Sequence, residues 1–178
     1  LGSRTLEAVE RVDILINNAG VIFPGSILDI KIDEWQTTFD VDLLAPLLLT
    51  QAFAPGMIER KHGKIINISS RAGLQGQTGL GAYSAAKAGL HLLTRVMAVE
   101  FGPHGIQANC LAPTVTMTDM ARAVWTPGPR TDAKLGRIPA GRFGEPNEIA
   151  DGVLFLSSHL SDFVSGTVLP VDGGEGAG

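Results

Sequence analysis

Tyr83 and Lys87 stand four residues apart in the segment Tyr83-Ser84-Ala85-Ala86-Lys87. If the segment is helical, this spacing places the phenol and the ammonium group on one helix face. A cation about 4 Å from a phenolate, at an effective dielectric constant of about 20, stabilises it by roughly 4 kcal/mol. That interaction would lower a tyrosine pKa from about 10 toward 7, where the phenol can exchange a proton with a substrate hydroxyl or carbonyl. Alone the pattern is weak, because most such pairs are ordinary surface residues.

Polar segments follow three predicted strands at the point where each strand ends. Ser70 directly follows KIINIS, thirteen residues before Tyr83. Asn17 to Gly20 leave an earlier strand, and Pro113 to Thr118 leave a later one. Open α/β sheets bind ligands at the carboxyl edge of their parallel strands. We therefore expect these segments to converge on one crevice.

Strand and helix patterns alternate along the chain, which predicts a parallel sheet with helices on its faces. The predicted strands are residues 13–17, 64–69, 106–112 and 167–174, and the predicted helices are residues 4–10 (the tail of a helix), 33–60, 82–101 and 146–158. Asp33 is the expected N-cap of the second helix, and Pro46 and Pro55 are expected to bend or interrupt it. Residues 113–145 hold four prolines and are interpreted as a long, partly helical loop, typical of a lid.

Composition limits the class of protein. Hydrophobic residues make up 44% of the chain and charged residues 18%, which suits a globular protein, and the formal net charge of −4 without a basic stripe gives no reason to expect nucleic-acid binding. The longest apolar run, residues 43–49, is far shorter than the roughly 20 residues of a membrane span. The single cysteine, Cys110, fits a reducing cytoplasm, and the four histidines are too dispersed for a metal site.

Together these residues closely resemble the short-chain dehydrogenase/reductase family, through Asn17-Asn18-Ala19-Gly20, the set Ser70, Tyr83 and Lys87, the proline-led loop after Pro113 and the closing GTVLPVDGG. The resemblance extends from about Val12 to Gly174. It implies a Rossmann-type, doubly wound parallel sheet of the α/β class. It also implies hydride transfer between NAD or NADP and an alcohol or carbonyl carbon, in a homodimer or homotetramer assembled through residues 40–60 and 83–101.

The resemblance implies a role for each residue of the site. Tyr83 would be the general acid/base, Lys87 would lower its pKa and bind the nicotinamide ribose, and Ser70 would polarise the substrate oxygen. The positions implied to contact the cofactor, besides Tyr83 and Lys87, are Asn18, Ala19, Gly20, Pro113, Thr116 and Thr118. For Thr118, an N-cap role remains the alternative.

Two positions depart from the family pattern. Asp42 stands where the family usually has an asparagine that holds a water linking the lysine to solvent. An ionised aspartate cannot donate a hydrogen bond, and its charge would partly offset Lys87, so the proton relay is expected to differ. Thr114 follows Pro113 where the family usually has glycine, which resembles the L-xylulose reductase and carbonyl reductase branch.

The glycine-rich fingerprint that cradles the pyrophosphate in this family is missing from the sequence. The glycine cluster at residues 73–83 fails the G-x-G-x-x-G pattern at its last position and is interpreted as a substrate-side loop. We therefore expect residues 1–178 to form a single NAD(P)-binding domain that is incomplete at the N-terminus and lacks the family's first three strands. The strand at residues 13–17, apolar nearly throughout as in strands covered on both faces, would then have one unpaired edge.

These observations predict a cytoplasmic NAD(P)-dependent oxidoreductase that acts on a sugar, a polyol or a small ketone. No membrane, nucleic-acid or metal partner is expected. A 3-oxoacyl-thioester reductase is one alternative, and a truncated, non-catalytic family member that serves as a scaffold is another. Trp125, in the long loop, is predicted either to line the substrate pocket or to anchor the lid.

Overall fold

The computed structural model describes residues 8–177, so the predicted helix at residues 4–10 falls largely outside the described part of the chain. Its strands are β1 (Ile14–Asn17), β2 (Gly63–Ile68), β3 (Ile106–Pro113) and β4 (Val168–Val171). They form a parallel sheet in the order β1-β2-β3-β4. The predicted parallel α/β sheet is confirmed. The last strand is shorter than predicted, because Gly173 and Gly174 take positive φ angles of 60° and 87°, which end the extended chain.

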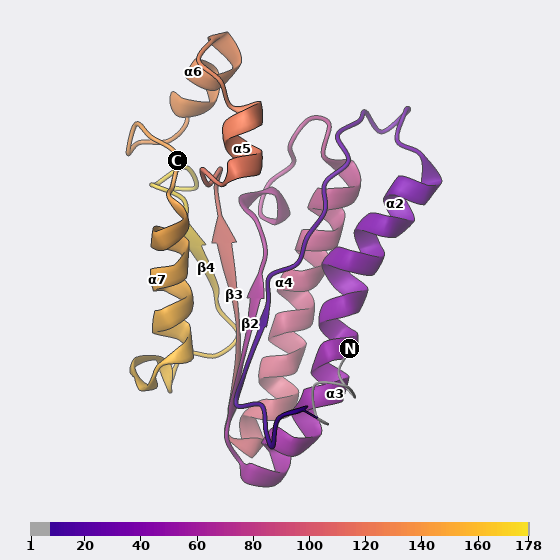
Figure 1. Ribbon diagram of the computed structural model, residues 1–178, viewed down its shortest axis with the longest axis vertical. Coiled ribbons are helices and arrows are strands. Elements are labelled where there is room, and N and C mark those ends of the chain that lie inside the picture. The colour runs from indigo at the N-terminus through magenta and orange to yellow at the C-terminus, as the bar shows by residue number, and fades with distance from the viewer. Residues whose placement is uncertain (1–7, 178) are drawn as a thin grey trace.

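The helices cover both faces of this sheet. They are α2 (Ile32–Phe39), α3 (Ala45–Arg60), α4 (Gly81–Phe101), α5 (Asp119–Val124), α6 (Pro129–Leu135) and α7 (Pro146–Ser157). Figure 1 shows α3 and α4 on one side of the strands, α7 on the other, and α5 and α6 beyond the carboxyl ends of the strands. The lid predicted for residues 113–145 thus contains two short helices above the sheet edge.

Two apolar layers hold the helices to the sheet, because successive strand side chains point to opposite faces. On the α3 and α4 side the buried residues are Leu15, Phe53, Met57, Ile65, Met97, Ile106 and Ala108. On the α7 side they are Ile66, Leu111 and Leu156. Both layers converge on β2 and β3, which are therefore the rigid centre below the candidate site.

Strand β1 is covered on one face only, contrary to the prediction from its apolar sequence. Leu15 is buried against the α3 and α4 layer, whereas Ile14 and Ile16 remain 44% and 46% exposed. Within the described residues β1 pairs with β2 alone, so its other edge is open, as the sequence predicted. The apolar sequence of β1 therefore did not reveal that one of its two faces is exposed among residues 8–177.

The helix predicted from Asp33 to Arg60 is interrupted by a π-helical turn at Asp40–Leu44. Its N-cap is Lys31, and Asp33 lies in the first turn. At the interruption, Ala45 N–H donates to the Asp40 carbonyl, five residues back. Pro46 follows in the first turn of α3 and has no N–H with which to continue the α-helical ladder. The predicted interruption is confirmed, and it contains Asp42, whereas Pro55 lies inside α3 without ending it.

The run Ile32–Arg60 is also long and apolar enough to cross a membrane, by length and composition alone. It packs beside α4 and along β1 and β2, as the core helix of an α/β domain does. Asp42, within this run, is fully buried.

Candidate active site

The carboxyl edge of the sheet brings together the residues predicted to carry chemistry. Because all strand pairs are parallel, the ends of β1, β2 and β3 lie along this edge. Ser70 follows β2, and Tyr83 and Lys87 occupy the first two turns of α4. Asp42 reaches the same place from the π-helical turn, 3.8 Å from the Lys87 ammonium.

Lys87 is held firmly beneath the site. Its side chain is only 4% exposed, and Nζ donates a hydrogen bond of 3.0 Å to the Ile68 carbonyl at the end of β2. Burial lowers the pKa of Lys87, while the Asp42 carboxylate acts in the opposite direction. The ammonium is therefore fixed between the end of a strand and a buried acid.

Tyr83 differs electrostatically from the prediction. Burial raises its pKa, the nearby Ser70 hydroxyl lowers it, and the Asp42 carboxylate raises it further. Lys87 Nζ lies against the face of the phenol ring, 5.5 Å from its centroid, and Asp42 lies 3.8 Å from the same ammonium. The net result is a raised pKa in place of the expected shift toward 7.

Asp42 is fully buried, and only one of its oxygens has a hydrogen-bond partner. Oδ1 accepts the Val21 N–H at 3.0 Å, while Oδ2 has no partner among the described residues. Burial raises the pKa of Asp42, and Lys87 and the Val21 N–H counteract it. The position that departs from the family pattern is thus in direct electrostatic contact with the predicted catalytic lysine.

The segment Asn18-Ala19-Gly20 leaves β1 along the same edge and is exposed. A Cβ atom at Gly20 would lie 3.1 Å from Asp42 Oδ1 and 3.6 Å from Lys87 Nζ. Glycine therefore keeps the space above this ion pair free. The start of the segment is anchored because the buried Asn17 amide donates to Asn67 Oδ1 at 2.7 Å.

The loop after β3 supplies the other predicted cofactor contacts. Pro113 ends the strand, and Thr116 forms an isolated parallel bridge with Gly144. Thr118 Oγ1 accepts the Ala121 N–H at 3.3 Å and caps α5. Thr118 is therefore an N-cap, which was the alternative role predicted for it from the sequence.

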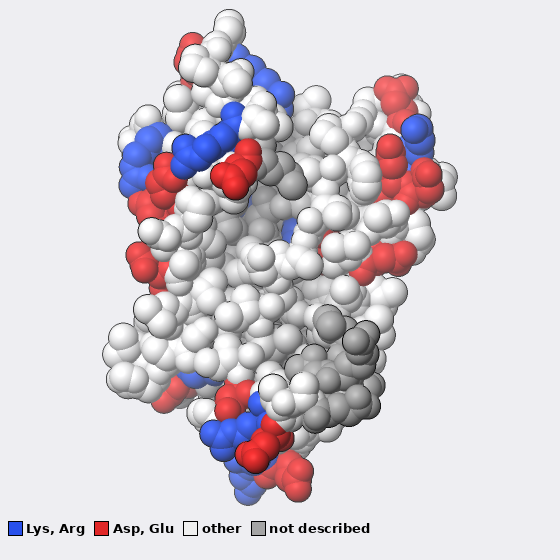
Figure 2. Space-filling model, viewed as in Figure 1, with Lys and Arg blue, Asp and Glu red and all other residues white. Residues whose placement is uncertain are grey.

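Ser70 and Tyr83 line one pocket with a volume of about 280 Å³. Thr116 and Trp125 border it from the lid side, and Leu80 borders it from the glycine-rich loop, which agrees with the substrate-side interpretation of that loop. Figure 2 shows the surface hollowed between the lobe of α5 and α6 and the lobe of α2. The pocket is where a small molecule can meet both hydroxyl groups.

Two residues that line this pocket, Arg71 and Lys134, were not predicted from the sequence as site residues. Arg71 forms an ion pair of 3.1 Å with Asp172, and Lys134 pairs with Glu175 at 2.5 Å. Burial opposes ionisation of Glu175, but hydrogen bonds from Lys134 and Thr114 leave its pKa lowered. A signal existed, because Arg71 directly follows Ser70 and the two acids follow the last strand at the same sheet edge.

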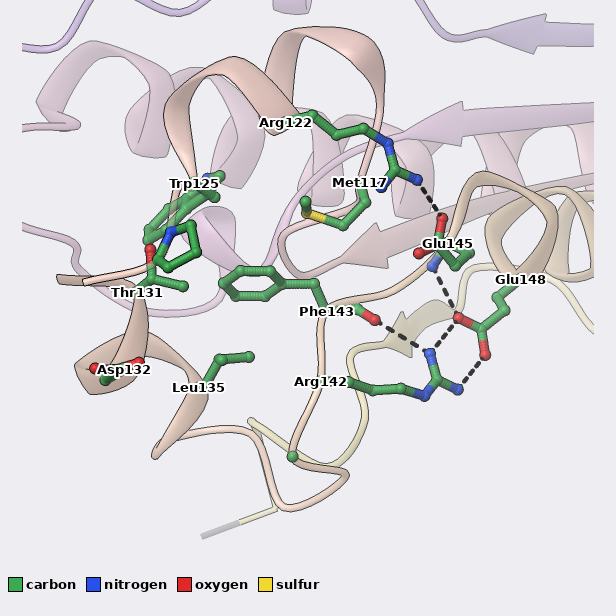
Figure 3. Close-up of a pocket in the computed structure, with 12 residues that line it drawn as sticks. Met117, Arg122, Trp125, Thr131, Asp132, Leu135, Arg142, Phe143, Glu145 and Glu148 are labelled. Atoms are coloured by element: carbon green, nitrogen blue, oxygen red, sulfur yellow. Dashed lines mark hydrogen bonds and ion pairs between the residues drawn. The ribbon is translucent and has the colours of Figure 1, made fainter. Parts of the chain in front are cut away.

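A larger pocket of about 680 Å³ lies under the lid, away from Ser70 and Tyr83 (Figure 3). Trp125 and Phe143 pack with ring centroids 5.3 Å apart. The pairs Arg122–Glu145 and Arg142–Glu148, with distances of 2.9 and 2.6 Å, border the pocket. Trp125 lines both pockets, and whether it contacts substrate or anchors the lid stays a prediction.

Comparisons with known proteins extend these observations. A family model described as "Enoyl-(Acyl carrier protein) reductase" matches residues 1–175. L-xylulose reductase from Bos taurus is 42% identical over 172 residues, which are 96% of this chain and 70% of that protein. 2-Dehydro-3-deoxy-D-gluconate 5-dehydrogenase from Formosa agariphila is 41% identical over 92% of this chain and 62% of its own length.

The chain is also similar to solved structures of dehydrogenases. A gluconate 5-dehydrogenase from Burkholderia cenocepacia, crystallised with NADP and tartrate, superposes with a TM-score of 0.95 at 36% identity. The match covers 99% of this chain and 69% of that one. The chain therefore spans roughly two thirds of the length of the proteins that it matches.

Proposed function

The chain belongs to the short-chain dehydrogenase/reductase family of NAD(P)-dependent oxidoreductases, and we propose that it interconverts an alcohol and a carbonyl through a site made of Ser70, Tyr83 and Lys87. One observation carries the proposal. Ser70 and Tyr83 line the same pocket, and the Lys87 ammonium lies against the face of the Tyr83 ring. In this proposal residues 1–178 form one NAD(P)-binding domain.

The residues at the sheet edge fit a nicotinamide cofactor. Gly20 leaves free the space that a Cβ atom would fill above Asp42 and Lys87, so a flat ring system can approach there. The residues that would hold the cofactor are Asn18, Ala19, Gly20, Tyr83, Lys87, Pro113, Thr116 and Thr118. When bound, the nicotinamide supplies or accepts the hydride at the substrate carbon.

The chain's own residues handle the proton and the orientation of the substrate. Ser70 donates a hydrogen bond to the substrate oxygen and fixes it in front of Tyr83. Tyr83 gives its proton to that oxygen during reduction and removes one during oxidation. Burial raises the pKa of Tyr83, and the protonated phenol is the form that reduction requires. Lys87 contributes positive charge beneath the ring, moderated by Asp42.

The substrate proposed is a sugar, a polyol or a related small carbonyl compound. The names of the relatives, L-xylulose reductase and gluconate dehydrogenases, favour this class. A 3-oxoacyl-thioester reductase is the second candidate, favoured by the acyl-carrier description of the matching family model. The pocket volume of about 280 Å³ supports the smaller substrate.

A cytoplasmic homodimer or homotetramer completes the proposal. Apolar side chains that remain more than 40% exposed on α3 and α4 support an interface there: Leu48, Leu92, Val96 and Val99. The proposal includes no membrane and no nucleic acid as partner.

The test is an activity assay with the full-length protein, because the pyrophosphate-binding fingerprint expected of the family is missing from residues 1–178. NADPH or NADH is supplied with L-xylulose, 5-keto-D-gluconate or an acetoacetyl thioester, and loss of the reduced nicotinamide is followed. We expect turnover with at least one of the two sugar-derived compounds. Turnover of the thioester alone would favour the second candidate, and no turnover with any compound would favour the non-catalytic scaffold.

A further inference from the structure

The pocket that contains Ser70 and Tyr83 is lined by two cationic side chains and by no carboxylate among the described residues. The cations are Arg71, from the turn after β2, and Lys134, from α6 in the lid. Their side chains are only 8% and 12% exposed. Positive charge at this position comes from two separate segments, and neither is needed for the proton transfer assigned to Tyr83.

Both cations form ion pairs with acids that follow β4 and do not line the pocket. Asp172 pairs with Arg71 and accepts backbone N–H groups of Gly174 and Gly176 at 3.0 Å. Glu175, with a side chain 0% exposed, pairs with Lys134 and also accepts the Thr114 hydroxyl. Both acids therefore have their hydrogen-bond partners within the protein. They hold the two cations in place, and neither acid lines the pocket.

The two cations retain donors for a ligand. A guanidinium group has five N–H donors and an ammonium group three. Arg71 Nη2 donates to Gln75 Oε1 at 3.1 Å. Nε lies 3.1 Å from Asp172 in an ion pair but makes no hydrogen bond, and Nη1, which lies against Gly176, has no partner among residues 8–177. Lys134 Nζ has a single hydrogen-bond partner there, Glu175. A carboxylate binds through charge-assisted hydrogen bonds from cationic groups, and Arg71 and Lys134 both have N–H donors left for such bonds.

We propose that the substrate is a hydroxy acid or keto acid whose carboxylate binds to Arg71 and Lys134; this inference rests on the proposed function. Arg71 directly follows Ser70 in the chain, so the acid group sits close to the reacting carbon–oxygen bond. A pocket of about 280 Å³ accommodates a short sugar acid, below the roughly 300–1,000 Å³ typical of drug-sized ligands.

The charge of the cluster favours a carboxylate over a phosphate ester. Arg137 lies 3.9 Å from Glu175 and adds a third cation. Three cations and two carboxylates leave one formal positive charge. That excess is neutralised by a monoanion, whereas a phosphate ester would bring nearly two negative charges.

The test measures binding rather than turnover, so that it can fail independently of the proposed function. Trp125 lines the pocket, and its fluorescence reports occupancy. The purified protein is titrated with D-gluconate, with D-glucitol, which lacks the carboxylate, and with D-glucitol 6-phosphate. We expect gluconate to bind at least tenfold more tightly than the other two.

A matched pair of variants assigns the effect to the pocket. Lys134→Gln and Arg137→Gln each remove one cation from Glu175, but Arg137 is 57% exposed and does not line the pocket. We expect Lys134→Gln to lose the preference for gluconate and Arg137→Gln to keep most of it, because Arg137 adds charge to the cluster but does not line the pocket. Arg71→Lys, which keeps the charge but loses the planar fork, should weaken gluconate binding several-fold, and thermal melting shows which variants are folded.

Three results would overturn the inference: equal binding of gluconate and glucitol, tighter binding of the phosphate ester, or a gluconate preference that survives in Lys134→Gln. An absence of nicotinamide turnover together with selective gluconate binding would instead contradict the proposed function alone.

Discussion

At the residue scale, the Asp42 carboxylate acts on both Lys87 and Tyr83. It lies 3.8 Å from the ammonium and raises the pKa of the phenol. Oxidation of an alcohol needs the deprotonated phenol as a base, whereas reduction of a carbonyl needs the protonated phenol as an acid. Asp42, which adds to the pKa increase caused by burial, therefore moves formation of the phenolate that oxidation needs to higher pH.

The first prediction concerns Asp42→Asn. Because Asp42 raises the pKa of Tyr83, removing its charge should lower that pKa and move the rise of the oxidation rate to lower pH. Tyr83 is the only tyrosine in the sequence, so a titration of phenolate absorbance measures its pKa directly. Asp40→Asn changes an exposed neighbour in the same turn and serves as the control. Identical titrations of Asp42→Asn and wild type would refute this role.

The second prediction concerns the phenol itself. Tyr83→Phe removes the oxygen that transfers the proton and keeps the ring on which Lys87 packs. General acid–base catalysis is worth about 10²–10⁴-fold, so kcat should fall by that factor while the dissociation constant for the cofactor stays nearly unchanged. If the variant keeps more than about a tenth of the wild-type kcat, another group transfers the proton.

At the element scale, a buried hydrogen bond fastens α4 to the end of β2. Ser69 Oγ lies 2.6 Å from His91 Nε2 and 3.3 Å from the Lys87 carbonyl. These contacts join the helix that carries Tyr83 and Lys87 to the strand end that carries Ser70. Burial, followed by the charge of Arg95, lowers the pKa of His91 to about 4, so the imidazole is neutral in the folded protein at pH 7.

The third prediction follows from this pKa. In the unfolded chain His91 binds a proton near pH 6.5, and in the folded protein only near pH 4. The unfolded state therefore holds more protons between these values, and the free energy of unfolding should fall as the pH decreases from 6.5 to 4. The loss is at most roughly 3.5 kcal/mol, at about 1.4 kcal/mol for each pKa unit.

Urea unfolding at several pH values across this window measures the effect. His91→Gln keeps a hydrogen-bonding side chain beside Ser69 but does not titrate, so its stability should depend less on pH. His104→Gln changes an exposed histidine and should leave the pH dependence as in wild type. Parallel pH profiles for His91→Gln and wild type would count against the assignment.

The secondary structure was largely predictable, and the contacts between distant segments were not. Three strands follow from continuous apolar runs bounded by turn residues, and the residues after them were placed at one edge because parallel strands end together. The raised pKa of Tyr83 could not be predicted, because it depends on burial and on where Asp42 lies relative to the ring. The cations of the pocket were missed because their acid partners follow the last strand, far from Arg71 and Lys134 in the sequence.

At the scale of the whole molecule, the most unusual feature is the side of the sheet formed by β1. On the face that Figure 2 shows, charged side chains gather toward the two ends and few lie across the middle. By the alternation of strand side chains, Ile14 and Ile16 point away from the α3 and α4 layer to which Leu15 belongs. Within the described residues, an open strand edge is thus combined with an exposed apolar face.

The final prediction is that these 178 residues, purified alone, self-associate through β1. An open edge with apolar side chains invites pairing with another chain, and Ile14 and Ile16 would each bury their exposed surface in doing so. Ile16→Lys places a charge on that face and should shift the species seen by size-exclusion chromatography and light scattering toward smaller mass. Leu28→Lys changes a loop residue that is 95% exposed and should have no such effect. A monodisperse protein whose mass does not change with concentration or with Ile16→Lys would show that β1 is not an association surface. An interface through α3 and α4 would instead respond to Val99→Lys, which changes an α4 side chain that is 76% exposed.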